Sequence, residues 1–211
     1  MPVSYIYKRM IRGEIKKLTK PVTLKLFTSS KNLQESVYMM DTMDTYQKGS
    51  NGMLKIEEYK LESNSEIVKK YDVQQAPAIL LINNQGIEIL RYLAVPMASE
   101  IEPFVQALMI FTGAPNYYEA TIKQNLNKLD TIIIKVLITD SCVYCPNILS
   151  ICSQFALASE GKIRTVIIDI IAHPDIGEQY NVSTVPFLII NEEKKLNGVI
   201  SAEDLLKELL N

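Results

Sequence analysis

The stretch TDSCVYCPN, residues 139–147, holds two of the three cysteines of this 211-residue chain. The apolar run IIIKVLI (132–138) precedes it, and the stretch ILSICSQFALA (148–158) that follows has apolar residues at helical spacing. The cysteine pair therefore lies in the turn where a strand is expected to enter a helix. Three cysteines are too few for a secreted disulfide framework, so a close pair is expected to be catalytic or metal-binding.

The spacing of Cys142 and Cys145 predicts two different roles. At the start of a helix, unpaired N–H groups and the helix dipole favour an anion, so we expect the first thiol, Cys142, to have a lowered pKa and to act as the nucleophile. One helical turn brings Cys145 beneath it, close enough to attack a mixed disulfide formed at Cys142 and to release the partner. Pro146 falls within the first turn, where its missing N–H costs little.

The residues TVP (184–186), directly before the apolar strand FLII (187–190), form the second candidate element. A proline at the head of a strand can take the cis form, which turns the preceding backbone outward. The freed N–H and C=O of Val185 would then pair with an extended substrate segment, as in strand addition. We expect Thr184, Val185 and Pro186 to bind substrate, together with Tyr144 beside the cysteines.

The chain runs twice through one order of elements. Each half is predicted to contain a first helix, a strand, a helix, a strand, a short helix, two strands that form a hairpin, and a closing helix. The break between the halves falls at TGAPN (112–116). We expect a thioredoxin-like unit without a CxxC motif at residues 1–115 and one with the motif at residues 116–211. The fold class is α/β, with a mixed sheet covered by helices on both faces built twice.

Two gapless alignments support the doubling. SEIVKKYDVQQAPAILL (65–81) lies over PDIGEQYNVSTVPFLII (174–190), and this pairs Pro77 with Pro186. LFTSSKNLQ (26–34) lies over LITDSCVYC (137–145). The second alignment puts Lys31 and Gln34 at the positions of the two cysteines, so the first half is expected to lack redox chemistry there.

Composition narrows the classes of partner. The formal net charge is -2 and the pI is about 5.6, so the chain lacks the excess of positive charge that is typical of proteins that bind nucleic acid or an anionic membrane. No apolar run reaches membrane-spanning length, and the first twenty residues contain neither an uninterrupted apolar core nor a small-residue cleavage site. We therefore expect a cytoplasmic protein whose partners are proteins or small molecules.

The order strand, CxxC, helix, strand, helix, TVP, hairpin and helix resembles the thioredoxin and glutaredoxin fold. The doubled arrangement, with an extra helix ahead of each half, resembles the protein disulfide oxidoreductases of thermophilic archaea, also called glutaredoxin-like proteins, and this likeness covers almost the whole chain. It implies disulfide exchange with protein substrates, with Cys142 attacking, Cys145 resolving and Pro186 as a cis proline. Members with two active sites carry a CxxC in each half. The departure from that pattern in the first half puts in question an isomerase-like activity that needs two dithiols.

Two other functions remain open on the sequence. A doubled unit with its only CxxC in the second half also resembles the N-terminal domain of the alkyl hydroperoxide reductase flavoprotein, which passes electrons to a peroxiredoxin. The general oxidoreductase would take its electrons from a donor such as a thioredoxin reductase-like protein. A non-catalytic scaffold that shares zinc with a partner is the third alternative. Two cysteines and one distant histidine do not complete a tetrahedral zinc site, so we expect neither metal nor cofactor.

Three further residues near the motif have simpler interpretations. Cys152 lies on the same helix face as Cys145 and is expected to be a buried structural thiol. His173, the only histidine, stands at the start of a helix, where a metal or proton-transfer role is the less favoured interpretation. Asp140 is expected to be a solvated turn residue, and its carboxylate would oppose formation of a nearby thiolate.

Overall fold

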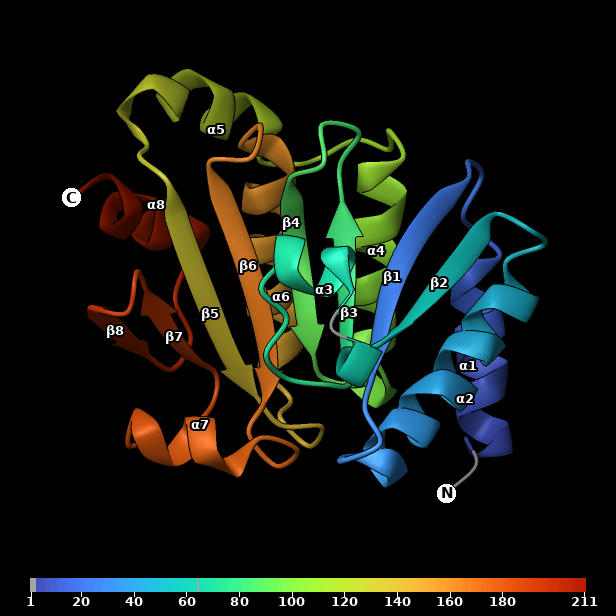
Figure 1. Cartoon of the computed structure of the whole chain (residues 1–211). Coiled ribbons are helices and arrows are strands. Elements are labelled where there is room, and N and C mark those ends of the chain that lie inside the picture. Colours follow the sequence, from blue (N-terminus) through green and yellow to red (C-terminus); the bar gives the residue numbers. More distant parts are fainter. Residues whose placement is uncertain (1–2, 64) are drawn as a thin grey trace.

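The computed structural model describes residues 3–63 and 65–211 as an α/β fold built around one mixed sheet (Figure 1). Among these residues the sheet has eight strands in the order β2-β1-β3-β4-β6-β5-β7-β8. The elements of the first half are α1 (Tyr5–Ile15), β1 (Val22–Thr28), α2 (Leu33–Gly49), β2 (Leu54–Lys60), η1 (Leu61–Ser63), α3 (Glu66–Lys70), β3 (Ala78–Ile82), β4 (Glu88–Leu93), η2 (Ala98–Glu100) and α4 (Ile101–Phe111). Those of the second half are α5 (Glu119–Asn125), η3 (Leu126–Lys128), β5 (Ile132–Ile138), α6 (Cys145–Ala158), β6 (Ile163–Asp169), α7 (Pro174–Gln179), β7 (Phe187–Ile190), β8 (Lys194–Asn197) and α8 (Ala202–Leu210).

The two halves have the same strand order and the same strand directions. In the first half β1 pairs with β2 in parallel, β1 with β3 antiparallel and β3 with β4 antiparallel. In the second half β5, β6, β7 and β8 repeat these three pairings in the same sequence. The fold is therefore the predicted pair of tandem thioredoxin-like units, each preceded by a helix, α1 or α5.

The sequence predicted one sheet for each unit, but the two sheets are continuous. β4 pairs in parallel with β6, from Leu90 opposite Thr165 to Leu93 opposite Ile168. Both strands are the edge strands of their own units, and an unpaired apolar edge readily takes another strand. The edges left free are β2 and β8, which carry lysine side chains that discourage further pairing.

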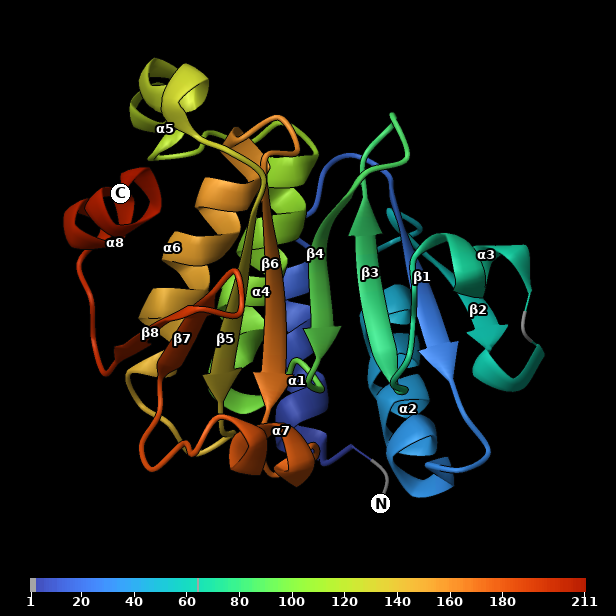
Figure 2. The same cartoon turned by 60° about the vertical axis from the view of Figure 1, so that its left-hand side comes forward.

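The helices divide unequally between the two faces of the sheet. α1, α2, α4 and α6 lie side by side on one face, and the short helices α3 and α7 lie on the other (Figures 1 and 2). Each face has its own cluster of buried apolar side chains, of which the larger lies under the four long helices. Phe104 of α4 lies in this larger cluster, with its ring 5.1 Å from those of both Tyr46 and Tyr92.

The predicted start of the helix after the cysteine motif is wrong by three residues. We expected the helix to begin at Cys142, whereas α6 begins at Cys145. Pro146 explains the difference, because it has no N–H to donate to the carbonyl of Cys142 and so cannot extend the helical hydrogen bonds to that residue. The strand β8 was not located from the sequence, because KKLN (194–197) is polar and carries little apolar pattern.

None of the helices in the described part of the chain is both long and apolar enough to span a membrane.

The packing of Phe104 predicts a large loss of stability on truncation. Phe104 is 1% exposed and contacts aromatic rings from α2 and β4. We expect Phe104→Ala to lower the free energy of unfolding by about 3–5 kcal/mol, because it removes a buried ring and leaves a cavity. The control is Phe111→Ala, which truncates a partly buried ring on the same helix and should cost clearly less. Urea titration followed by circular dichroism measures both, and equal losses would contradict this view of the core.

Candidate redox site

The two cysteines of the motif form a disulfide where β5 meets α6. The sulfur atoms of Cys142 and Cys145 are bonded, and their Cα atoms lie 5.5 Å apart. The N–H of Cys145, at the start of α6, donates to the Sγ of Cys142 over 3.1 Å. The first sulfur therefore accepts a hydrogen bond from one of the N–H groups at the helix start that have no partner within the helix.

Burial distinguishes the two sulfurs. Cys142 is 9% exposed and Cys145 is 1% exposed, so the residue that faces solvent is Cys142. The two residues between them point outward, with Val143 78% and Tyr144 63% exposed. A partner that approaches the motif thus meets the side chain of Tyr144 and the sulfur of Cys142 before it can reach Cys145.

Strand pairing brings the TVP segment to the disulfide. β5 and β7 are antiparallel with Leu137 opposite Phe187, so the start of β7 lies beside the end of β5. The peptide bond between Val185 and Pro186 is cis. Pro186 is buried and its carbonyl accepts from the N–H of Gly198 over 2.9 Å. In the described part of the chain neither the N–H nor the C=O of Val185 has a hydrogen-bond partner.

Thr184, the first residue of that segment, is exposed, and its hydroxyl donates to Oδ1 of Asn197 over 2.7 Å. This bond ties the segment to the end of β8. The four residues predicted to bind substrate thus lie on two loops, Tyr144 between the cysteines and 184–186 before β7, which strand pairing places at the same end of the sheet. The side chain of Val185 packs partly buried against the larger apolar cluster.

A buried carboxyl group that the sequence did not reveal lies at the same end of the sheet. Glu100 of η2 is 3% exposed and packs beside α6, and its Oε2 has no hydrogen-bond partner within the residues described. Burial, and after it the charges of Asp169 and Asp140, raise the pKa of Glu100 to about 8. A single glutamate at the start of a predicted helix carries no sequence signal of burial, because its burial depends on tertiary packing, including the contact of η2 with α6.

The remaining candidates near the motif differ in their burial. Cys152 is fully buried, and burial raises the pKa of its thiol well above the usual value, so it stays protonated. His173 is 6% exposed at the start of α7, and burial lowers the pKa of its imidazole against the opposing charges of Asp175, Asp169 and Glu35. Asp140 is an exposed turn residue.

The ends of α2 and α6 show how the two units align. Ser50 follows α2 and accepts from the N–H of Leu54 over 2.9 Å, and Ser159 follows α6 and accepts from the N–H of Ile163 over 2.8 Å. Each serine hydroxyl also donates to the carbonyl three residues before it. The two serines are therefore equivalent, and residues along the two helices can be matched by counting back from them.

This matching corrects the sequence alignment of the motif. Ser36 precedes Ser50 by as many residues as Cys145 precedes Ser159, so Ser36 and not Gln34 takes the position of Cys145. Ser36 is 2% exposed, like Cys145, whereas Gln34 is exposed. Two offsets of one residue add up here: the strand pairing matches Phe27, not Leu26, to Leu137, and the turn after β1 is one residue longer than the turn after β5.

The exposed Leu33 accordingly takes the position of Cys142, in place of Lys31. The first unit thus has a leucine where the second has its outer cysteine and a buried serine where the second has its inner one. Neither side chain can exchange disulfides, so the expectation of a redox-silent first unit holds although its residues were misassigned.

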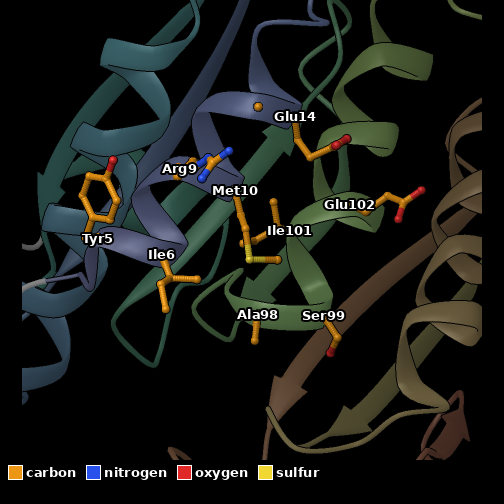
Figure 3. A pocket seen from close by; sticks show the side chains of 10 residues that line it. Tyr5, Ile6, Arg9, Met10, Glu14, Ala98, Ser99, Ile101 and Glu102 are labelled. Atoms are coloured by element: carbon orange, nitrogen blue, oxygen red, sulfur yellow. The ribbon is translucent and has the colours of Figure 1, made fainter.

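A groove of about 580 Å³ lies between α1 and the start of α4 (Figure 3). Met10 and Ile101 face each other across it, and Tyr5 and Ile6 lie at its outer side. Neither cysteine of the disulfide lines this groove. Within residues 3–63 and 65–211 no group of three or more His, Cys, Asp and Glu side chains could hold a metal ion.

Comparison with known proteins agrees with this fold. Residues 132–211 match the family model described as a thioredoxin domain. A protein disulfide oxidoreductase from Aeropyrum pernix is 25% identical, with a TM-score of 0.87 over 100% of this chain and 93% of that chain. The alkyl hydroperoxide reductase protein AhpF from Enterococcus faecalis is 18% identical, with a TM-score of 0.82 over 96% of each chain. No curated protein sequence matches the chain.

The chain is thus a doubled thioredoxin-fold protein with one CxxC disulfide, and its predicted resemblance to the archaeal protein disulfide oxidoreductases is confirmed. The likeness to AhpF, at 18% identity, shows the fold. Together these comparisons support a redox class of enzyme in general.

Glu100 predicts a specific pH dependence of stability. Its pKa is about 8 in the folded chain and 4.5 in the unfolded one, so the folded state holds the proton more tightly. The stability that this proton contributes is complete below pH 4.5 and is lost as the pH rises to about 8. We expect Glu100→Gln to remove this decrease in the free energy of unfolding, which amounts to at most ~1.4 kcal/mol per pH unit. Urea titrations of both proteins across this range test it, and parallel curves would contradict it.

Proposed function

We propose that the chain is a thiol-disulfide oxidoreductase that exchanges disulfides with protein substrates through Cys142 and Cys145. The observation that carries the proposal is the disulfide itself, between an outer and an inner cysteine, beside a backbone segment with unpaired hydrogen-bonding groups at Val185. The thioredoxin-domain match over residues 132–211 and the fold of the Aeropyrum pernix oxidoreductase support it.

The exchange proceeds in two displacement steps. With the site reduced, the thiolate of Cys142 attacks one sulfur of a substrate disulfide, that disulfide breaks, and the released sulfur takes up a proton. The thiolate of Cys145, formed by loss of its proton, then attacks the Sγ of Cys142 and expels the second substrate sulfur as a thiol. The substrate gains two electrons and two protons, and the site becomes the Cys142–Cys145 disulfide. The reverse sequence oxidises a substrate dithiol.

The start of α6 would favour the first step. The N–H of Cys145 donates to the Sγ of Cys142 and, with the other free N–H groups of the helix start, stabilises a negative sulfur. The nearby acids Asp140 and Asp169 oppose it. We propose that the hydrogen bond outweighs these charges, because it acts on the sulfur directly while Asp140 is exposed to water.

The open backbone of Val185 would hold the substrate. An extended segment of the partner would pair with its N–H and C=O, with Thr184 and Pro186 on either side and Tyr144 contacting the partner from the loop between the cysteines. Main-chain pairing of this kind depends little on sequence, which suits an enzyme that acts on several proteins.

A narrower role is supported by the likeness to AhpF from Enterococcus faecalis, whose name is that of an alkyl hydroperoxide reductase. In this second proposal the dithiol carries electrons to one partner, a peroxiredoxin, and receives them from a thioredoxin reductase-like donor. Both proposals place the protein in the cytoplasm, where such donors keep thiols reduced. Both also take residues 116–211 as the catalytic unit and residues 1–115 as the silent one.

The intermediate provides the test. In Cys145→Ser a mixed disulfide formed at Cys142 has no resolving thiol, so this variant should accumulate covalently linked partner proteins from a cell extract. Cys142→Ser should trap few or none, because Cys145 is buried and lacks the helix-start hydrogen bond. Non-reducing electrophoresis, with identification of the bands, measures both. Equal trapping by the two variants would overturn the assigned order of attack.

Further outcomes of this experiment separate the alternatives. One dominant peroxiredoxin band would favour the electron carrier, and a varied set of proteins would favour the general oxidoreductase. Cys152→Ala is the control, because a fully buried thiol with a raised pKa should change stability and leave trapping intact. If no reducible adduct formed in any variant, the exchange proposal would fail and metal analysis for shared zinc would become the next measurement.

A further inference from the structure

The first unit contains a counterpart of the substrate-binding segment. Ala76 and Pro77 occupy the place that Val185 and Pro186 hold in the second unit, and the peptide bond between Ala76 and Pro77 is also cis. By analogy with Val185 and Pro186, this segment would be a second edge able to bind an extended chain. The side-chain contacts of the first unit indicate the opposite.

Asn32 is bonded to this segment. Its Nδ2 donates to the carbonyl of Ala76 over 2.8 Å. In strand addition that carbonyl accepts from a backbone N–H of the incoming chain, so the amide of Asn32 stands in for the ligand. Ala76 is 2% exposed, whereas Val185 is partly exposed and has no hydrogen-bond partner for its carbonyl in the described part of the chain.

Asn32 is available for this bond because of its position before α2. It is the N-cap residue of the helix, yet its side chain makes no capping bond to the helix. The turn that carries it is one residue longer than the matching turn of the second unit. Counting back from the helix ends puts Ser141 opposite Asn32, and the only hydrogen bond of the Ser141 hydroxyl within the described residues is a 3.4 Å contact with Thr139.

A second set of bonds holds the same turn in place. Glu62 accepts from the hydroxyls of Ser29 and Ser30 and from the N–H of Ser30, over 2.6 to 2.9 Å. Ser36 accepts from the N–H of Ser29 over 3.0 Å and donates to its carbonyl over 3.1 Å. The hydrogen bond from the hydroxyl of Ser29, and after it the other bonds, lower the pKa of Glu62 to about 2, so its carboxylate stays charged near neutral pH. Asn32 is thus presented on a fixed turn.

We infer that Asn32 closes the strand-addition edge of the first unit, so that extended protein chains bind at Val185 alone. This inference rests on the proposed function for the role of Val185. Asn32 would act as a specificity-determining residue: it directs the substrate to the one edge that lies beside a disulfide.

The test counts binding sites for an extended chain that cannot exchange disulfides. The probe is the insulin B chain, reduced, carboxymethylated and labelled with fluorescein, titrated into the full-length protein. We expect the wild type to bind one chain at saturation and Asn32→Asp to bind two. Aspartate keeps the size and the capping ability of asparagine, but it has no N–H to donate and its charge repels the carbonyl of Ala76.

The matched control is Gln34→Glu. It makes the same change from amide to carboxylate two positions along the chain, at an exposed side chain with no hydrogen bond among the described residues, and should leave the count at one. Asn32→Ala, which removes the amide without adding charge, should bind two chains, like Asn32→Asp. Circular dichroism of all three variants verifies that they fold.

The outcomes decide the inference without relying on thiol chemistry. Two chains bound by the wild type would mean that the first edge is open, and one chain bound by both Asn32 variants would mean that Asn32 does not close it. Either result overturns the inference while the trapping of partners by Cys145→Ser is unaffected. Val185→Pro removes the N–H of the second edge and should abolish the site of the wild type. The double variant Val185→Pro, Asn32→Asp should bind one chain, at the edge opened in the first unit. Retention of wild-type binding in Val185→Pro would equally overturn it.

Discussion

The parallel pairing of β4 with β6 is the interaction on which the arrangement of the molecule depends. It joins two four-stranded sheets into one and aligns β1 with β5 in the same direction. The turns that follow these two strands, one with the disulfide and one with Asn32, therefore lie along the same rim of the sheet (Figure 1). The pairing also brings η2 against α6, so that the buried Glu100 of the first unit lies near Asp140 and Asp169 of the second.

Much of this arrangement could be predicted because it depends on local patterns. The strands VTLKLF and IIIKVLI are recognisable by their apolar residues, and Cys142 and Cys145 by their spacing in a turn between strand and helix. The joining of the sheets could not be predicted in this way. Apolar periodicity indicates that β4 and β6 are buried, but it does not indicate which strand pairs with each of them. The burial of Glu100 could not be predicted for the same reason: it depends on tertiary packing, including the contact of η2 with α6 of the other unit.

The misassignment of the first unit has a different physical origin. A gapless alignment follows residue identity, whereas the backbone follows hydrogen bonds. A one-residue offset in the strand, where Phe27 and not Leu26 matches Leu137, and one extra residue in the turn together displaced the motif by two positions. The buried hydroxyl of Ser36 is hydrogen-bonded to the backbone N–H and C=O of Ser29 and takes the place of a thiol. The sequence around Gln34 does not indicate this. Pro146 had a similar effect in the second unit. Because Pro146 has no N–H, α6 begins only at Cys145, whereas the equivalent helix α2 begins at Leu33, the position that matches Cys142.

The common direction of β1 and β5 has a consequence for how large a partner the rim accommodates. Four strand spacings separate the two strands in the sheet, about 19 Å at ~4.8 Å for each. The footprint of a standard protein complex on one partner is about 800 Å², roughly 30 Å across. A single folded protein can therefore touch both turns at once, with its reactive sulfur over Cys142 and its flank resting on the exposed side chain of Leu33. Under the proposed function, the first unit would support such a partner without exchanging electrons with it, because neither Leu33 nor Ser36 has a thiol.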